Sequence, residues 1–421
     1  MKIRKPSKLV IFLTVFIDLV GFGIVLPLLP IYSQNLGASG FVIGAIMAAY
    51  SAMQFLFAPV WGRLSDRIGR RPVLLVSIAG SALSYGLFAY GSTLAGTAGL
   101  TILLISRLLA GIGGANIAVA QAYIADITPP DKRSQSMGLI GMAFGLGFIF
   151  GPALGALALR WFGLQGPGWL AAGLCVFDFV LALFILGESW NPGAAPVAPR
   201  PRLQQWFHTL GQPKIGLLIV LFFLATFAFT CFETTLGLLV VRNFHLDSSK
   251  AEDAKTIGYL FAYCGVIGAF VQGGAIGRAV KKLGEPRLIT VSLVLTAASL
   301  APLPFVAGWT GLLIALALLA IGSSLTRAPI FGMISILTPA HEQGGTIGVA
   351  QSFGSLARIA GPIFAATLFT VDPKIPYLVC AGVSLVAAGL AWGKLGTMAP
   401  AAALVAAATA APTATTETAR S

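Results

Sequence analysis

Six ionisable side chains lie inside long apolar runs of this 421-residue chain, and their chemistry is the most informative feature of the sequence. They are Asp18, Arg107, Asp178, Glu233, Arg327 and Arg358. A charge inside a lipid bilayer is costly, so ionisable residues retained there usually serve protons, ions or substrates. A buried carboxylate gains or loses a proton as its surroundings change, whereas an arginine stays charged. The pattern predicts proton or ion chemistry within a membrane.

Two of the carboxylates are candidates for proton coupling. Asp18 lies near the middle of the first apolar run, where Gly21 and Gly23 allow close helix packing. Glu233 lies deep in a later run and has no basic neighbour on its own helix, so it would be easy to protonate when buried. A structural hydrogen-bond acceptor is the alternative for Asp18, and a contact for a cationic substrate is the alternative for Glu233.

The remaining intramembrane polar residues are candidates for a substrate cavity or for contacts between helices. Asp178 and Arg327 could line the cavity, or they could form polar contacts between helices. For Arg358 we expect such a contact between helices. Three uncharged candidates for the cavity are Gln54, Asn116 and Gln121. All three histidines fall in predicted loops, so proton coupling would have to use carboxylates.

Composition places the chain in the membrane class. It is 57% hydrophobic and only 10% charged, whereas a soluble domain carries roughly 25% charged residues. The net charge of +13 comes from short basic clusters between apolar runs, so no nucleic-acid partner is expected. The cysteines lie within apolar runs and no histidine or nucleophile cluster is present, so we expect neither an enzyme nor a metal site.

A bilayer-spanning helix needs about 20 apolar residues, and on that rule the sequence predicts an all-α protein with about twelve spans. Their ranges are 9–32, 41–61, 72–91, 98–124, 135–160, 168–187, 214–241, 256–280, 287–306, 309–335, 343–370 and 374–394. Basic residues concentrate in alternate loops, which predicts a multi-pass protein of the cell inner membrane with both termini in the cytoplasm.

The spans divide into two halves. We expect an N-terminal six-helix half at 1–187, a cytoplasmic linker at 188–213, a C-terminal six-helix half at 214–394 and a disordered cytoplasmic tail at 395–421. The pair Gly151-Pro152 recurs as Gly361-Pro362, and Thr128-Pro129 recurs at the same offset. A parallel repeat of six spans is typical of transporters whose halves rock about a site near the membrane midplane.

The stretch 62–71 packs four arginines and one aspartate between two spans, and we interpret it as a short charged turn. Positive charge in such a turn can simply orient the protein. Asp126 ends the fourth span on the same side and could pair with Arg67, Arg70 or Arg71. We therefore predict a cytoplasmic gate that breaks when the halves rock. Its residues are Gly62, Asp66, Arg67, Gly69, Arg70, Arg71 and Asp126.

Several motifs resemble those of a known family. The stretch 62–71 reads glycine, three residues, Asp, Arg, any residue, Gly, Arg, Arg, and resembles the signature loop of the major facilitator superfamily. Segments 18–30, 107–116 and 147–155 are similar to first-, fourth- and fifth-span motifs of its drug/proton antiporter branch. The run 53–75 is similar to bacterial tetracycline exporters, although those exporters carry an acidic residue where this chain has Ser84.

The resemblance implies roles for residues of the fourth and fifth spans. It implies that Arg107 sets the protonation of a carboxylate, with a permanent salt bridge between helices as the alternative. It also implies that the fifth span packs between the halves and prevents leak. The residues of this antiporter helix are Gly147, Gly151, Pro152 and Gly155.

The sequence thus predicts a secondary transporter that works by alternating access. We expect a monomer that exports a small, largely apolar compound in exchange for protons, with the proton gradient as energy source and no cofactor. An exporter of a sugar or other metabolite, or a proton symporter, remains the alternative. A channel is disfavoured because the two-half repeat indicates rocking rather than a fixed selectivity filter.

Overall fold

The computed structural model describes residues 5–29, 32–33, 36–38, 40–190, 202–245 and 251–396, and these contain helices and no strand. Twelve candidate spans are long and apolar enough to cross a membrane. The predicted all-α architecture with twelve spans is confirmed, including the separation of the ninth and tenth spans. The predicted tail lies outside the described residues from 397 onward, as do residues 191–201 of the linker.

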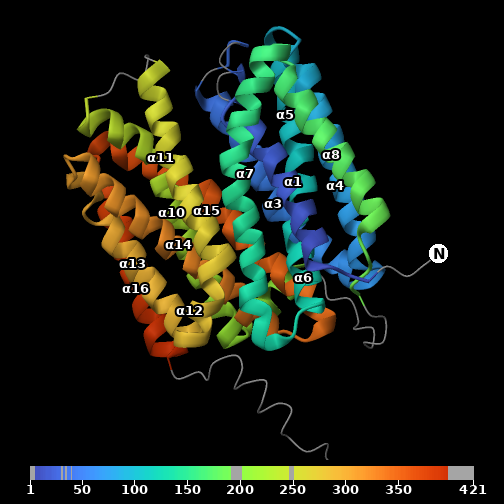
Figure 1. Cartoon of the computed structure of the whole chain (residues 1–421), viewed down its shortest axis with the longest axis vertical. Helices are drawn as coiled ribbons and strands as arrows, with labels where there is room; N and C mark the ends of the chain where they lie inside the picture. The colour runs from blue at the N-terminus through green and yellow to red at the C-terminus, as the bar shows by residue number, and fades with distance from the viewer. Residues whose placement is uncertain are drawn as a thin grey trace, which may run out of the picture.

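Two groups of helices lie side by side (Figure 1). The first group consists of α1 (Lys8–Val25), α3 (Gly40–Ile68), α4 (Arg70–Gly91), α5 (Gly96–Gly114), α6 (Ile117–Asp126), α7 (Arg133–Phe162) and α8 (Gly166–Ile185). The second consists of α10 (Pro213–Asn243), α11 (Ala251–Phe270), α12 (Ile276–Leu283), α13 (Glu285–Leu300), α14 (Trp309–Leu337), α15 (Gln343–Val371) and α16 (Ile375–Leu395). The outer surface carries exposed apolar side chains such as Phe184 and Trp392, as expected of helices that face lipid.

Several spans that we predicted as continuous helices are not: α1 ends at Val25 and α13 at Leu300, inside the predicted first and ninth spans, and the fourth and eighth spans are interrupted. The fourth span breaks between α5 and α6 at Ala115 and Asn116, directly after Gly113 and Gly114. Glycine is a weak helix former, which explains the break at this point. The eighth span contains a π-helical turn at Val271–Ala275 between α11 and α12. Such turns often occur at functional sites.

The predicted charged turn at 62–71 is wrong in its extent. Helix α3 continues through Ile68 and α4 begins at Arg70, so the turn is confined to Gly69. Gly69 has φ +98°, a conformation that favours glycine because it has no Cβ. The other residues of the stretch are helical, and Asp66 and Arg70 among them form ion pairs, described below. We call this end of the molecule the arginine-rich face.

The linker between the two groups contains a short helix, α9 (Arg202–Gly211). Its Trp206 ring lies 5.2 Å from Phe55 on α3 and 5.6 Å from Phe353 on α15, measured between ring centroids. The linker helix therefore contacts one span from each half.

Candidate gate and translocation site

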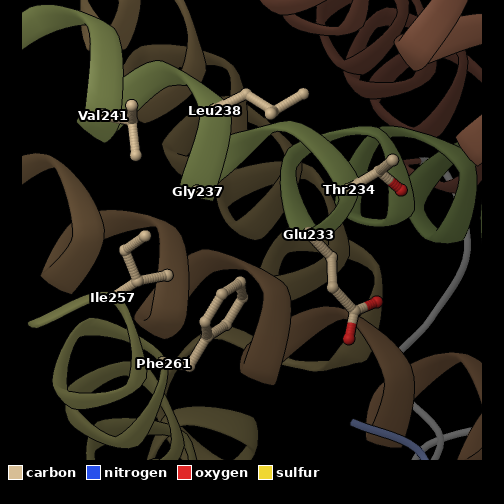
Figure 2. Close-up of a pocket in the computed structure, with 7 residues that line it drawn as sticks. All are labelled: Glu233, Thr234, Gly237, Leu238, Val241, Ile257 and Phe261. Atoms are coloured by element: carbon tan, nitrogen blue, oxygen red, sulfur yellow. The ribbon is translucent and has the colours of Figure 1, made fainter. Parts of the chain in front are cut away.

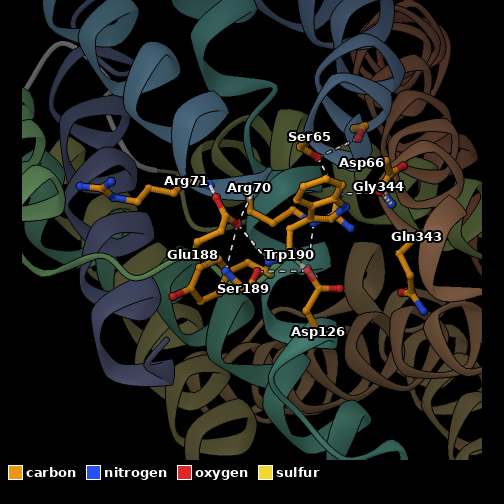
Figure 3. Close-up of polar contacts among 12 residues, drawn as sticks. Ser65, Asp66, Arg70, Arg71, Asp126, Glu188, Ser189, Trp190, Gln343 and Gly344 are labelled. Atoms are coloured by element: carbon orange, nitrogen blue, oxygen red, sulfur yellow. Dashed lines mark hydrogen bonds and ion pairs between the residues drawn. The ribbon is translucent and has the colours of Figure 1, made fainter. Parts of the chain in front are cut away.

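Arg70 is the centre of a cluster of charged residues at the arginine-rich face (Figure 3). Its side chain is fully buried, donating from Nη1 to Asp66 Oδ1 at 2.5 Å and from Nε to Asp126 Oδ2 at 3.0 Å. A buried guanidinium is stable only when its charge and donors are paired. Among the arginines that could pair with Asp126, the structure brings Arg70 to it, while Arg67 is exposed.

Asp66 connects this cluster to the second half of the protein. Its Oδ1 accepts the backbone N–H of Gly344 at 3.0 Å, and its Oδ2 accepts that of Gly345 at 2.8 Å. Both amides belong to the first turn of α15, whose free N–H groups and partial positive charge favour a carboxylate. One aspartate therefore binds an arginine of its own half and the end of a helix from the other half.

Close approach of the two helix backbones makes this contact possible. A Cβ at Gly62 would collide with the carbonyl oxygen of Gly344, and a Cβ at Gly344 would collide with that of Gly62. Glycine at both positions lets α3 and α15 touch, which brings Asp66 within hydrogen-bond distance of the α15 amides.

We predict that Gly62→Ala prevents this close approach. The added methyl group meets backbone on α15, so we expect a loss of roughly 1–3 kcal/mol of stability for the closed gate, as for an overpacked core. Gly80→Ala on α4 is the matched control, because nothing lies within 4 Å of the added Cβ. Thermal unfolding of both variants in detergent tests this. A melting temperature for Gly62→Ala at or above that of Gly80→Ala would contradict the prediction.

Glu188 is a member of the cluster that the sequence did not reveal as a site residue. Its carboxylate accepts the backbone N–H of Arg70 at 2.9 Å and of Arg71 at 3.1 Å, which caps the first turn of α4. The Arg71 side chain points away and donates to the carbonyl of Leu183 at 2.8 Å. Glu188 stands where the predicted linker begins, and only the fold brings it back to Gly69.

In the second half, the residues near the start of α13 make different contacts from those of the Asp66 cluster. Glu285, at the start of α13, is 3% exposed and accepts a hydrogen bond at 3.0 Å from the hydroxyl of Ser134 on α7. Arg133, also on α7, donates to the carbonyl of Ser335 at 2.8 Å. Here the carboxylate accepts a side-chain hydroxyl from the other half, whereas Asp66 accepts two backbone amides, so the two sides of the gate are unlike.

Within the membrane, Asp18 lies against three polar groups. It is 8% exposed and accepts a long hydrogen bond of 3.4 Å from the amide of Asn116, at the break between α5 and α6. The hydroxyl of Ser81 on α4 is also close to it. Asp178 on α8 is fully buried and interacts electrostatically with Asp18. Two carboxylates in one apolar region disfavour each other's ionisation, so this pair is suited to holding a proton.

Arg107 contacts aromatic rings rather than a carboxylate. Its guanidinium carbon lies 5.6 Å from the Tyr85 ring centroid and 5.4 Å from that of Phe88, and the side chain is 1% exposed. No carboxylate of the described residues lies within 4 Å of it. Tyr50 and Tyr85 interact electrostatically with both Arg107 and Asp18. These tyrosines, which no sequence motif indicated, therefore interact with both the cation and the carboxylate.

A polar layer joins the halves deeper in the membrane. Arg358 on α15 donates to the side-chain oxygen of Gln54 on α3 at 3.2 Å. Gln351, two turns earlier on the same face of α15, donates to Gln121 at 2.7 Å and accepts from Arg327 at 3.4 Å. Four of the residues predicted from sequence as intramembrane polar groups are thus linked across the two halves. Asn116 belongs instead to the Asp18 group.

Glu233 lies at one end of a pocket between α10 and α11 with a volume of about 370 Å³ (Figure 2). The rest of the lining is Thr234, Gly237, Leu238, Val241, Ile257 and Phe261. Glu233 also interacts electrostatically with Arg358. The pocket therefore has an apolar wall with two polar side chains at one end, the composition usual for small-molecule pockets.

The glycines of the antiporter helix lie on the face of α7 that packs against α1. A Cβ at Gly151 would lie 2.6 Å from the Cα of Gly23, and one at Gly155 would lie 2.9 Å from the carbonyl of Ile24. Gly147 faces Leu19 in the same way, and Pro152 lies within the helix. Small residues permit this contact between helices in a membrane.

Comparisons with known proteins agree with this architecture. The family description "Major Facilitator Superfamily" matches residues 11–285 and 273–420. The chain is 34% identical over 365 residues to the class E tetracycline resistance protein of Escherichia coli, covering 85% of this chain and 86% of that protein. It is 26% identical over 393 residues to multidrug resistance protein 2 of Bacillus subtilis (strain 168), covering 92% and 94% of the two chains.

A solved structure is similar as well. The human organic anion transporter MFSD10 (TETRAN) superposes with a TM-score of 0.79 and 25% sequence identity, covering 92% of this chain and all of that one. The chain belongs to the major facilitator superfamily. It is a multi-pass membrane transporter related to tetracycline and multidrug exporters, and not an enzyme.

Proposed function

We propose that this chain is a proton-coupled antiporter that exports a small, largely apolar, drug-like compound by alternating access. It acts as a monomer in the cell inner membrane, with the arginine-rich face and both termini in the cytoplasm. The names of its relatives, tetracycline resistance and multidrug resistance proteins, support export of such compounds. The single observation that carries proton coupling is the burial of Asp18 within the helix bundle, where it interacts electrostatically with a second buried carboxylate, Asp178.

The contacts between the halves suggest how the cycle proceeds. The Asp66–Gly344, Arg133–Ser335 and Gln54–Arg358 hydrogen bonds lie between the arginine-rich face and the middle of the spans. In our proposal these contacts close the cytoplasmic side while the outer side is open. A proton taken up from outside neutralises Asp18, the halves rock, and these contacts break. Release of the proton to the cytoplasm then accompanies capture of the substrate.

The proposal is tested by susceptibility of a pump-deficient bacterium to a panel of drugs, together with proton flux in inverted vesicles. We expect expression of the chain to raise resistance to at least one compound. When the same compound is added to energised vesicles, we expect protons to leave the vesicles in exchange for it. Resistance to no compound together with no substrate-dependent proton movement would refute drug/proton antiport. Protons that move in the same direction as the substrate would indicate symport instead.

A further inference from the structure

Two arginines of the second half lack an acidic partner at contact distance. Arg358 donates to Gln54 at 3.2 Å and to the hydroxyl of Ser355 at 3.1 Å, and Arg327 donates to Gln351 at 3.4 Å. All three partners are neutral. No carboxylate of the described residues lies within 4 Å of either guanidinium. Arg327 and Arg358 also repel each other electrostatically.

The charges of this region do not balance. Glu233 interacts with Arg358 from a longer distance, whereas the charged group that acts on Arg327 is Arg358 itself. Both guanidinium groups lie deep in the molecule, although each residue keeps some exposure. A cation removed from water without a compensating anion is costly. A ligand that brings a negative charge would remove that cost.

The surroundings of these arginines are aromatic and apolar. The guanidinium carbon of Arg327 lies 4.8 Å from the ring centroid of Phe144, 5.6 Å from that of Phe222 and 5.7 Å from that of Phe331. The three rings come from α7, α10 and α14, so they belong to both halves. Glu233, which interacts electrostatically with Arg358, lines a pocket with apolar side chains such as Leu238 and Phe261. This combination suits a ligand with an apolar or aromatic body and one charged group.

We infer that the transported compound is an amphiphilic organic anion, whose carboxylate or sulfonate binds Arg358 and Arg327. The inference rests on the proposed export function and specifies the substrate class for it. An anion at Arg358 competes with Gln54 for the same Nη2 donor. In the proposed cycle that hydrogen bond is broken while the cytoplasmic side is open, so Arg358 is then available to the anion. When the cytoplasmic side closes, Gln54 competes for the same donor, and this competition favours release of the exported anion on the outer side.

Two probes that share an aromatic skeleton test the charge requirement. Anilinonaphthalene sulfonate carries the anionic group, and phenylnaphthylamine lacks it. Both are titrated by fluorescence into the purified full-length chain in lipid nanodiscs. We expect Arg358→Gln to weaken binding of the sulfonate at least about tenfold, the loss of one charge-assisted contact, and to leave the neutral probe unchanged. Glu233→Gln should strengthen binding of the sulfonate, because it removes a competing anion.

Two further variants control for the possibility that Arg358→Gln loses binding because it fails to fold. Arg358→Lys keeps the positive charge and should retain more sulfonate binding than Arg358→Gln. Arg160→Gln, at an exposed arginine near the end of α7, should bind both probes as the unaltered chain does. Equal losses for both probes, unchanged sulfonate binding in Arg358→Gln, or weaker sulfonate binding in Glu233→Gln would overturn the inference. The titration needs no proton gradient, so a negative result leaves proton-coupled export standing.

Discussion

Asp66→Asn should insert normally in the membrane and yet lose most of its transport. The asparagine has one acceptor oxygen and no charge, whereas Asp66 accepts two α15 amides and the Arg70 guanidinium. Hydrogen bonds to a charged group contribute about 1.5–3 kcal/mol each. A net loss of about 2 kcal/mol from the closed gate corresponds to roughly a thirtyfold shift toward the open arrangement. Uphill export should fall by about tenfold or more, because a gate that stays open uncouples the two sides.

A cysteine behind the gate reports the same change. Thr346 lies one residue beyond the amides that bind Asp66 and is 2% exposed. Labelling of Thr346→Cys by an impermeant maleimide from the cytoplasmic side should be roughly thirtyfold faster when combined with Asp66→Asn. Asp131→Asn, an exposed aspartate at the same face, is the control. Inverted or failed insertion of Asp66→Asn would mean instead that the charged stretch serves only to orient the protein.

Asp18→Asn should abolish proton-driven export while leaving exchange of substrate across the membrane. Asparagine has nearly the same shape and can still hydrogen-bond Asn116, but it takes up no proton. Accumulation against a gradient in proteoliposomes should fall to the background, because no protonation step remains to drive the cycle. Exchange of labelled for unlabelled substrate should persist, because the halves can still rock with substrate bound.

Asp178→Asn distinguishes a shared proton from a proton held by Asp18 alone. If the two carboxylates share it, Asp178→Asn retains proton-driven export but shifts the pH of half-maximal transport downward, because removing a neighbouring negative charge makes Asp18 easier to ionise. Proton-driven export that survives intact in Asp18→Asn would show that coupling lies elsewhere, with Glu233 as the next residue to replace.

The two halves thus carry opposite imbalances of buried charge. The first half places Asp18 and Asp178 together, while Arg107 is held among aromatic rings. The second half places Arg358 within electrostatic reach of Glu233 and places Arg327 near Arg358. In our proposals, a proton neutralises the first half and an anionic substrate neutralises the second. Each set of residues can therefore be altered and measured separately.

The sequence by itself determined the number of spans, the two-half repeat and the short list of intramembrane ionisable residues. These properties depend on the composition of each segment alone. About 20 consecutive apolar residues are needed to cross a bilayer, and a charged residue within such a segment is costly and therefore easy to recognise. The family motifs likewise depend on residues close together in the chain.

The tertiary structure decided which of those residues meet. Asp66 and Gly344 lie far apart in sequence, and their contact depends on how closely α3 and α15 pack. Glu188 reaches Arg70 because the chain returns to α4 after α8. Nothing local in the sequence indicates that Arg107 would contact Tyr85 rather than a carboxylate. Side-chain partners in a helical bundle are set by interhelical packing, which pairs residues from distant segments and leaves no periodic pattern in either one.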